Sequence, residues 1–328
     1  MGVNAGAFFG TVLVGYLGET IGWSWGFGLA GIGMVLGLII FVIGRPALKG
    51  EGEPPVPLAR PMELKLQTTG IAAVGVVFFL IQAQEVVQTL LIITGIAMLA
   101  YTAWEAWKLP KEARERIFAM LFLIGLNPLF WGLFEQAGGS MNLYTDRYVD
   151  RAGVPTSLFQ SINPIYIIAL APMFAMLWQG LAKRGLEPSA PAKFGLALAQ
   201  VGLGFLVFVW GAGPEGTMTP VAFVFLIYLL HTTAELCLSP VGLSAMARLA
   251  PLHMASFVMG AWFYMTAVGQ FVAGKIGEAT GGESGTMSRA LVLDIYNTIG
   301  WVAIGVAALV LIVSPVVKRW MHLDTLED

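Results

Sequence analysis

Ten long stretches of the chain carry few or no charged side chains, and these stretches constrain the fold more than any other feature. A bilayer core about 30 Å thick is crossed by about 20 helical residues, because each residue adds about 1.5 Å. The runs are continuous rather than alternating, which disfavours a membrane β-barrel. We therefore predict an all-α polytopic membrane protein with ten helices, of which the first and third are short: Gly2–Leu17, Trp23–Gly44, Thr68–Gln82, Val86–Trp107, Phe118–Tyr144, Thr156–Leu181, Phe194–Gly211, Val221–Leu243, Ala255–Ile276 and Ala290–Val317.

The composition excludes several classes of protein. Of the 328 residues, 57% are hydrophobic and 12% are charged, which is about half the charged share of a soluble domain. A soluble enzyme, a secreted disulfide scaffold and a disordered tail are excluded, and the single Cys237 cannot form an internal disulfide. The net charge of −2, without a basic cluster, gives no reason to expect nucleic acid as a partner. The sequence shows no metal cluster, nucleophile with its base or phosphate loop, so we expect neither a cofactor nor enzymatic catalysis.

The Lys and Arg residues indicate how the helices are oriented, because cytoplasmic loops carry an excess of them. If the first helix leaves the cytoplasm, only four of the 18 Lys and Arg residues lie outside: Arg147, Arg151, Lys275 and Arg289. If the first helix instead entered the cytoplasm, most of the Lys and Arg residues would lie outside. The distribution therefore predicts that both ends of this chain are cytoplasmic.

A polar segment with five prolines, residues 45–67, divides the chain. Its composition predicts an extended cytoplasmic linker that breaks helices. Two predicted helices precede it, within residues 1–44, and eight follow. A transporter built from two six-helix halves would have such a linker at its midpoint. On this interpretation part of the front end is missing.

Two acidic residues, Glu135 and Glu235, stand deep inside predicted helices. An ionised carboxylate at the bilayer centre costs at least about 2.5 kcal/mol, so such residues usually face a bundle interior or an aqueous cavity and often carry ions or protons. No Lys or Arg lies at comparable depth, so both carboxyl groups are either protonated or paired with a group outside this chain. A protonated glutamate with a purely structural role is the alternative.

Several neutral polar residues accompany the two glutamates. Asn163 is followed by a proline, which permits a kink of the kind that borders transporter cavities or that is merely structural. Trp262 and Thr266 lie four residues apart and share a helix face; the tryptophan either walls a pocket or fills the core. His231, one turn before Glu235, either relays protons or is a satisfied core residue.

Six sequence stretches together resemble the proton-dependent oligopeptide transporter family, within the major facilitator superfamily. They are spread through most of the chain: MGVNAGAF (Met1–Phe8), GYLGE (Gly15–Glu19), WGFGLAGIGM (Trp25–Met34), FWGLFEQAGGSMNLYTDR (Phe130–Arg147), FQSINPIYI (Phe159–Ile167) and AELCLSPVGLS (Ala234–Ser244). The resemblance implies a partial major facilitator fold: the last two helices of the N-terminal bundle at 1–44, the linker at 45–67, an inserted helix pair at 68–107, a complete six-helix C-terminal bundle at 108–321, and a cytoplasmic tail at 322–328.

The resemblance also implies roles for individual residues. Glu135 would take part in proton coupling, and Asn163 and Glu235 would hold the amino terminus of a peptide. The remaining substrate-binding positions that it implies are Asn4, Trp262 and Thr266. Family members begin with four further helices that carry an E-x-x-E-R-F-x-Y-Y motif and a lysine, and this chain has neither. We therefore expect the chain to be a fragment or the product of a mis-started reading frame.

The function that this resemblance implies is proton-coupled symport of di- and tripeptides by alternating access across a bacterial inner membrane. Small peptides, protons and the lipid bilayer are the expected partners. A family relative that carries another solute, such as nitrate or an amino-acid derivative, is one alternative. A non-transporting truncated fragment is another, and a membrane enzyme ranks below both.

Overall fold

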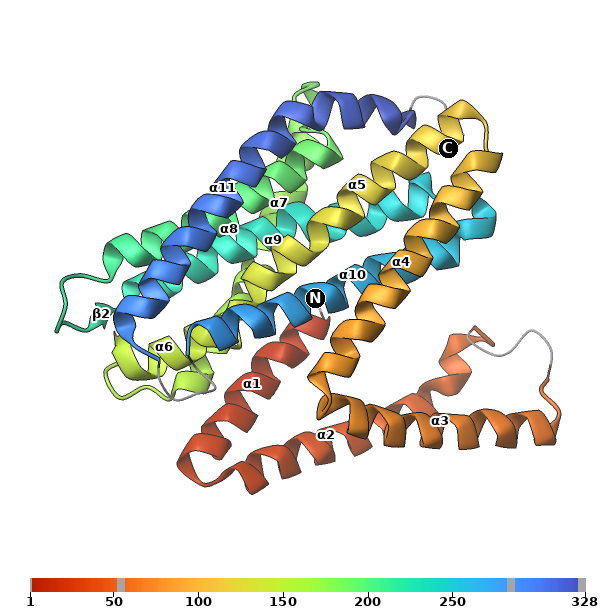
Figure 1. Cartoon of the computed structure of the whole chain (residues 1–328). Helices are drawn as coiled ribbons and strands as arrows, with labels where there is room; N and C mark the ends of the chain where they lie inside the picture. Colours follow the sequence, from red (N-terminus) through yellow and green to blue (C-terminus); the bar gives the residue numbers. More distant parts are fainter. Residues whose placement is uncertain (1, 52–56, 282–286, 324–328) are drawn as a thin grey trace.

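The computed structural model describes residues 2–51, 57–281 and 287–323, and nearly all of them are helical (Figure 1). Residue 1, residues 52–56 and 282–286, and the end of the predicted tail at 324–328 lie outside the described part. The main elements are α1 (Gly2–Thr20), α2 (Trp23–Gly44), α3 (Arg60–Ile81), α4 (Gln84–Lys108), α5 (Lys111–Phe134), α6 (Ser140–Tyr148), β1 (Val149–Asp150), α7 (Ile162–Lys183), α8 (Ala190–Gly211), β2 (Thr219–Pro220), α9 (Ala222–Leu249), α10 (Ala255–Ala279) and α11 (Arg289–Trp320). Short 3-10 helices join them: η1 (Arg45–Leu48), η2 (Glu135–Ala137), η3 (Thr156–Ser161) and η4 (Leu252–Met254).

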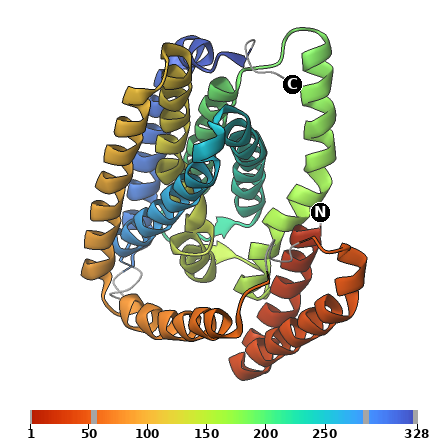
Figure 2. The ribbon, with the colours of Figure 1, turned by 90° about the vertical axis from the view of Figure 1, so that its right-hand side faces the viewer.

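The buried core lies in the bundle formed by α5 and α8 to α11, with α8 packed between α9 and α11 (Figure 2). Two glycines permit a close crossing of α8 and α11. A Cβ atom on Gly202 of α8 would lie 2.7 Å from the carbonyl oxygen of Gly300 on α11. Close backbone approach at small residues is how membrane helices pack without a hydrophobic driving force between them.

A helix forms at each of the ten predicted membrane segments. Among the described residues, nine helical segments are long and apolar enough to cross a membrane. Helix α1 is long enough, at 19 residues, but is not among these nine, so its lower hydropathy rather than its length sets it apart. The chain is therefore a multi-pass membrane protein.

The predicted helix Phe118–Tyr144 is wrong as a single element. Helix α5 ends at Phe134, and the chain passes through η2 and two glycines, Gly138 and Gly139, before α6 begins at Ser140. Apolar runs identify a span but not its interruptions, and adjacent glycines have low helix propensity because they lose the most backbone entropy. Glu135 therefore caps the carboxyl end of α5 rather than standing inside a continuous helix.

The predicted helix Thr156–Leu181 also begins differently. Its first six residues form η3, and α7 begins at Ile162. The proline after Asn163 lies in the first turn of α7, where a missing backbone N–H costs nothing. This proline therefore lies at the start of the helix and does not kink its interior. The proline in the interior of α7 is Pro172.

The linker predicted at 45–67 is shorter in the structure, because α3 begins at Arg60 instead of Thr68. Pro61 occupies the first turn of α3, where proline is favoured and does not break the helix. None of the α3 residues is buried, and Figure 1 shows α3 running across the view away from the core. Helix α4 follows after a break at Gln82 and Ala83 and passes along α5 and α10.

Candidate functional site

Asn163 and Glu235 lie against each other on facing helices, α7 and α9. The Asn163 amide Nδ2 donates to the Glu235 carboxylate Oε2 at 3.0 Å and is 3.1 Å from Thr232 Oγ1 on the same face of α9. Because Asn163 follows the η3–α7 junction directly, the start of α7 fixes where its amide points. The structure thus brings together two of the predicted substrate-binding residues, 72 positions apart in the sequence.

Glu235 is half-buried, and none of the ion pairs found among the described residues involves it. The amide of Asn163 supplies one hydrogen-bond donor, and a carboxylate has two oxygens with about four acceptor positions. A cationic group with several N–H donors fits the remaining positions.

Glu135 lines a cavity of about 460 Å³ between the end of α5 and helix α10. Four of the other lining residues are glycines, and Gln270 of α10 and Ser140 of α6 are the other polar residues of the lining. Small residues leave the carboxyl group accessible while it remains half-buried. The carboxyl group therefore lies at a cavity and not within the packed core.

Gln136 anchors Glu135 in place, and the sequence interpretation assigned it no role. Its side-chain Nε2 donates to the carbonyl oxygens of Gly132 at 2.9 Å and Ala273 at 3.1 Å, the second across to α10. Its Oε1 accepts from Ser140 Oγ at 2.6 Å. Gln136 is 1% exposed. Its position beside Glu135 in an apolar span could have indicated this role from the sequence, because a buried amide needs hydrogen-bond partners.

Trp262 lies in the core of the bundle. It is 2% exposed, and its ring packs edge-to-face on Phe194 of α8 with centroids 6.2 Å apart. Gly242 of α9 makes room for it, because a Cβ atom there would lie 2.0 Å from the indole ring. Of the two interpretations that the sequence allowed, the structure supports core filling.

Thr266, one turn later, is half-buried and donates to the Trp262 carbonyl at 3.1 Å within its own helix. Asn4 is half-buried near the start of α1. No hydrogen bond between either residue and the Asn163–Glu235 pair is found in the described part of the chain. Their substrate-binding roles stay predictions.

His231 is a core residue. It is 2% exposed, its Nε2 lies 3.2 Å from the Val201 carbonyl oxygen of α8, and its ring packs against Phe134 and Phe205. The structure places it toward α8, whereas Glu235 faces α7. A proton relay between His231 and Glu235 has no support in this geometry.

The end of α1 docks on the segment that leads into α7. The Glu19 carboxylate accepts from the backbone N–H groups of Thr156 at 3.0 Å and Ser157 at 2.7 Å. A Cβ atom on Gly15 would lie 2.6 Å from Ser157 Oγ, so only glycine permits this approach. Both residues belong to the GYLGE stretch, but sequence spacing did not reveal which segment they meet.

The arrangement suits recognition of a cation and transfer of a proton. A carboxylate held by an amide binds an ammonium group through charge-assisted hydrogen bonds. No group of three or more His, Cys, Asp or Glu side chains that could hold a metal ion occurs among the residues the structure describes.

A sequence model described as "PTR2: POT family" matches residues 1–288. The peptide transporter YePEPT of Yersinia enterocolitica is 35% identical over 305 residues, which cover 84% of this chain and 59% of the relative. Dipeptide and tripeptide permease B of Aeromonas hydrophila is 27% identical, with 98% of this chain and 67% of the relative covered.

A crystal structure of a mutant peptide transporter POT in complex with alafosfalin is similar to this fold. Its TM-score is 0.77 at 33% identity, and the match covers 98% of this chain and 67% of that one. The chain thus spans about 59% of the length of YePEPT. The family match over residues 1–288 and the shared helical architecture agree: this chain belongs to the POT family, with a partial major facilitator fold.

Proposed function

We propose that the protein carrying this chain is a proton-coupled symporter of di- and tripeptides that works by alternating access. The observation that carries the proposal is the Asn163–Glu235 pair, a carboxylate and an amide on facing helices without a cation among the described residues. The protonated amino terminus of a peptide supplies the missing positive charge. The names of two relatives, a peptide transporter and a dipeptide and tripeptide permease, support peptides over the other solutes considered above.

Glu135 is the residue we propose for proton coupling. It lines a cavity whose other residues include four glycines. In this proposal a proton on Glu135 removes one of two negative charges from the interior of the bundle. Loading of the peptide and of the proton are therefore coupled, because two like charges in a low-dielectric site disfavour each other.

The POT family is a family of transporters, and an enzymatic activity is not part of the proposal. The family's bacterial relatives and the helices long enough to cross a membrane support a bacterial inner membrane. The excess of Lys and Arg on one side supports cytoplasmic ends for this chain. The drive for transport would come from the proton gradient, with no cofactor.

Uptake of a labelled dipeptide into vesicles tests the proposal, with the whole protein that contains this chain. We expect Glu235→Gln to abolish uptake and exchange, because it removes the charge that binds the ammonium group. We expect Glu135→Gln to abolish gradient-driven accumulation while exchange of bound peptide continues. Glu278→Gln, which removes an exposed carboxylate outside the site, is the matched control. Normal accumulation by Glu235→Gln would overturn the proposal.

A further inference from the structure

A second cavity, of about 700 Å³, lies at the opposite end of the bundle from β1 and β2, between α7, α8, α9 and the end of α11. Its volume falls within the usual range of ligand pockets, about 300–1,000 Å³. In Figure 2, α7 stands apart from α8 and α9 toward its carboxyl end. The cavity does not contain Glu135, Asn163 or Glu235, so the proposed transport function does not account for it.

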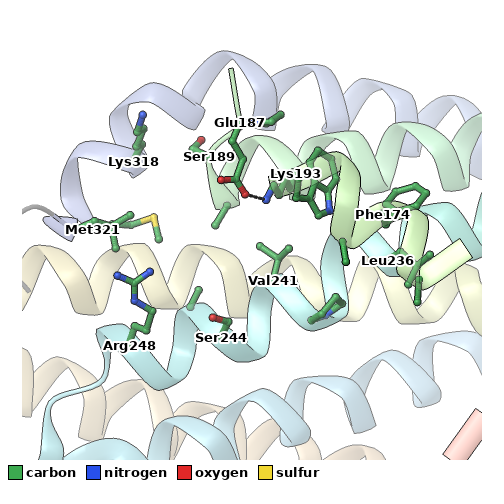
Figure 3. A pocket seen from close by; sticks show the side chains of 18 residues that line it. Phe174, Glu187, Ser189, Lys193, Leu236, Val241, Ser244, Arg248, Lys318 and Met321 are labelled. Atoms are coloured by element: carbon green, nitrogen blue, oxygen red, sulfur yellow. Dashed lines mark hydrogen bonds and ion pairs between the residues drawn. The ribbon is translucent and has the colours of Figure 1, made fainter. Parts of the chain in front are cut away.

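Three cationic side chains from three helices surround this cavity. Figure 3 shows Lys193 of α8 and Lys318 of α11 in the upper part of the view and Arg248 of α9 below them. Lys193 is 6% exposed and bonds to Glu187 at 2.5 Å. Arg248 and Lys318 are exposed, and neither forms an ion pair with the carboxylates that the structure describes. The cavity therefore carries a surplus of two positive charges.

The start of α8 adds to this positive field. Ser189 caps the helix, with its Oγ accepting from Ala192 N–H, and it lines the cavity. The amino-terminal end of a helix of 22 residues carries a partial positive charge from its aligned peptide dipoles. Side chains and backbone thus favour the same kind of ligand, an anion such as a phosphate group.

The cavity continues into an apolar groove on the outer surface of the bundle. Phe174 and Trp178 of α7 line both the cavity and the groove, and the remaining groove residues are Leu196, Ala199, Gln200, Leu203, Cys237 and Ile304. A free anion uses only the charged end. A molecule with an anionic head and a hydrocarbon tail fills both parts.

We propose that this cavity and groove bind an anionic phospholipid of the cytoplasmic leaflet, with the phosphate group near Arg248, Lys318 and the start of α8 and an acyl chain along α7 and α8. The charge distribution along the sequence assigns this end of the bundle to the cytoplasm. Basic pockets between membrane helices on that side bind anionic lipid headgroups. The lipid holds the separated end of α7 to α8 and α9.

The test uses the full chain in a neutral detergent and native mass spectrometry with two lipids of identical acyl chains. Phosphatidylglycerol is anionic and phosphatidylcholine is zwitterionic, so their difference reports the headgroup. We expect phosphatidylglycerol to bind more tightly. We expect the double variant R248Q/K318Q to bind it about 30-fold more weakly, because each basic residue near an anionic headgroup contributes about fivefold.

Two further variants separate charge from shape. R60Q/K65Q removes two positive charges from α3, on the same predicted side of the membrane and outside the cavity, and should bind phosphatidylglycerol like the unmodified chain. Ala199→Phe fills the groove while every charge stays in place, and it should lower the bound fraction of phosphatidylglycerol. Glycerol 3-phosphate, which has the phosphate without acyl chains, should not compete at concentrations near those of the lipid.

Four results would overturn the proposal. The first two are equal binding of the two lipids and equal losses of phosphatidylglycerol binding in R248Q/K318Q and R60Q/K65Q. The third is unchanged binding in Ala199→Phe. The fourth is competition by glycerol 3-phosphate as strong as by the lipid, which would indicate a soluble phosphate as the ligand. A fifth arm neutralises the acidic residues Asp324, Glu327 and Asp328. Lipid binding that arises only in this variant would assign the cavity to the chain's own acidic end instead.

Discussion

At the scale of single residues, the Asn163 amide distinguishes an ammonium site from an isolated buried acid. It contacts both Glu235 and Thr232, so it orients the carboxylate. We expect Asn163→Ala to raise the KM for a dipeptide about tenfold, because one hydrogen bond to a charged group contributes about 1.5–3 kcal/mol and water replaces part of it. Uptake kinetics measure this change.

Two controls show whether the Asn163 effect concerns the amino terminus. Ser161→Ala removes a neighbouring hydroxyl that bonds only to Leu158 in its own turn, and it should leave KM unchanged. An N-acetylated dipeptide, which lacks the ammonium group, should inhibit the unmodified protein and Asn163→Ala equally weakly. Strong, variant-dependent inhibition by that compound would contradict the assignment.

Trp262 shows where prediction from the sequence ends. Helical spacing placed Trp262 and Thr266 on one helix face, and the structure confirms that they lie on one helix, α10. Spacing alone does not determine which neighbour meets each residue. Gly242, twenty residues earlier on another helix, creates the space that the indole ring fills. The glutamates were predictable because burying a carboxylate is costly wherever it faces, whereas the position of a tryptophan depends on tertiary packing.

The core position of Trp262 leads to a prediction about stability. We expect Trp262→Ala to destabilise the protein by about 3–5 kcal/mol, the usual cost of emptying an aromatic site in a packed core, and to lower the apparent Tm in a thermal-shift measurement. Trp301→Ala is the matched control, because Trp301 of α11 is 55% exposed on the outer surface. Equal melting temperatures for the two variants would show that the indole of Trp262 is not a packing element.

At the scale of helices, apolar runs predicted where the spans are and missed how they end. The interruption at Glu135–Gly139 and the 3-10 segment before α7 both fall inside continuous apolar stretches. Hydrophobicity reports burial in lipid, and helix termination depends on local hydrogen bonds and on glycine entropy. The same limit applies at α3, where a proline starts a helix within a segment predicted as linker.

The contact between α1 and η3 gives a prediction at this scale. Glu19 accepts two backbone hydrogen bonds there, and a neutral glutamine accepts them more weakly because charge-assisted bonds are stronger. We expect Glu19→Gln to open this contact more often. A cysteine introduced at Gln160, which lines the small cavity beside Gly15, should then react about fivefold faster with a membrane-impermeant thiol reagent, equivalent to about 1 kcal/mol.

The background of this labelling experiment is low, since the native cysteine, Cys237, is buried. Glu278→Gln in the same cysteine variant removes an exposed carboxylate on α10 and should leave the labelling rate as it was. An unchanged rate in Glu19→Gln would mean that the close approach at Gly15 alone holds α1 against η3.

At the scale of the whole molecule, the fold distributes the basic residues unevenly between the two ends of the bundle. Arg289 donates to the carbonyl oxygens of Gly213 at 3.1 Å and Pro214 at 3.0 Å in the loop between α8 and α9. Arg151 bonds within the neighbouring loop beside β1. Lys193, Arg248 and Lys318 gather around the cavity at the opposite end. The bundle therefore has one sparsely basic end and one strongly basic end, which is the asymmetry that sets membrane orientation.

Two cysteine variants at the ends of one helix test this orientation. Val154 precedes α7 on the sparsely basic side and is 41% exposed, and Leu186 follows α7 on the basic side and is 65% exposed. In intact cells, an impermeant thiol reagent should label Val154→Cys and spare Leu186→Cys, because only the first faces outward if the basic end is cytoplasmic. Both should react once the cells are permeabilised, which controls for accessibility. The reverse labelling pattern in intact cells would mean that the bundle has the opposite orientation and that the proposed phospholipid site faces the outer leaflet. The uneven distribution of Lys and Arg would then not predict the orientation of this chain in its membrane.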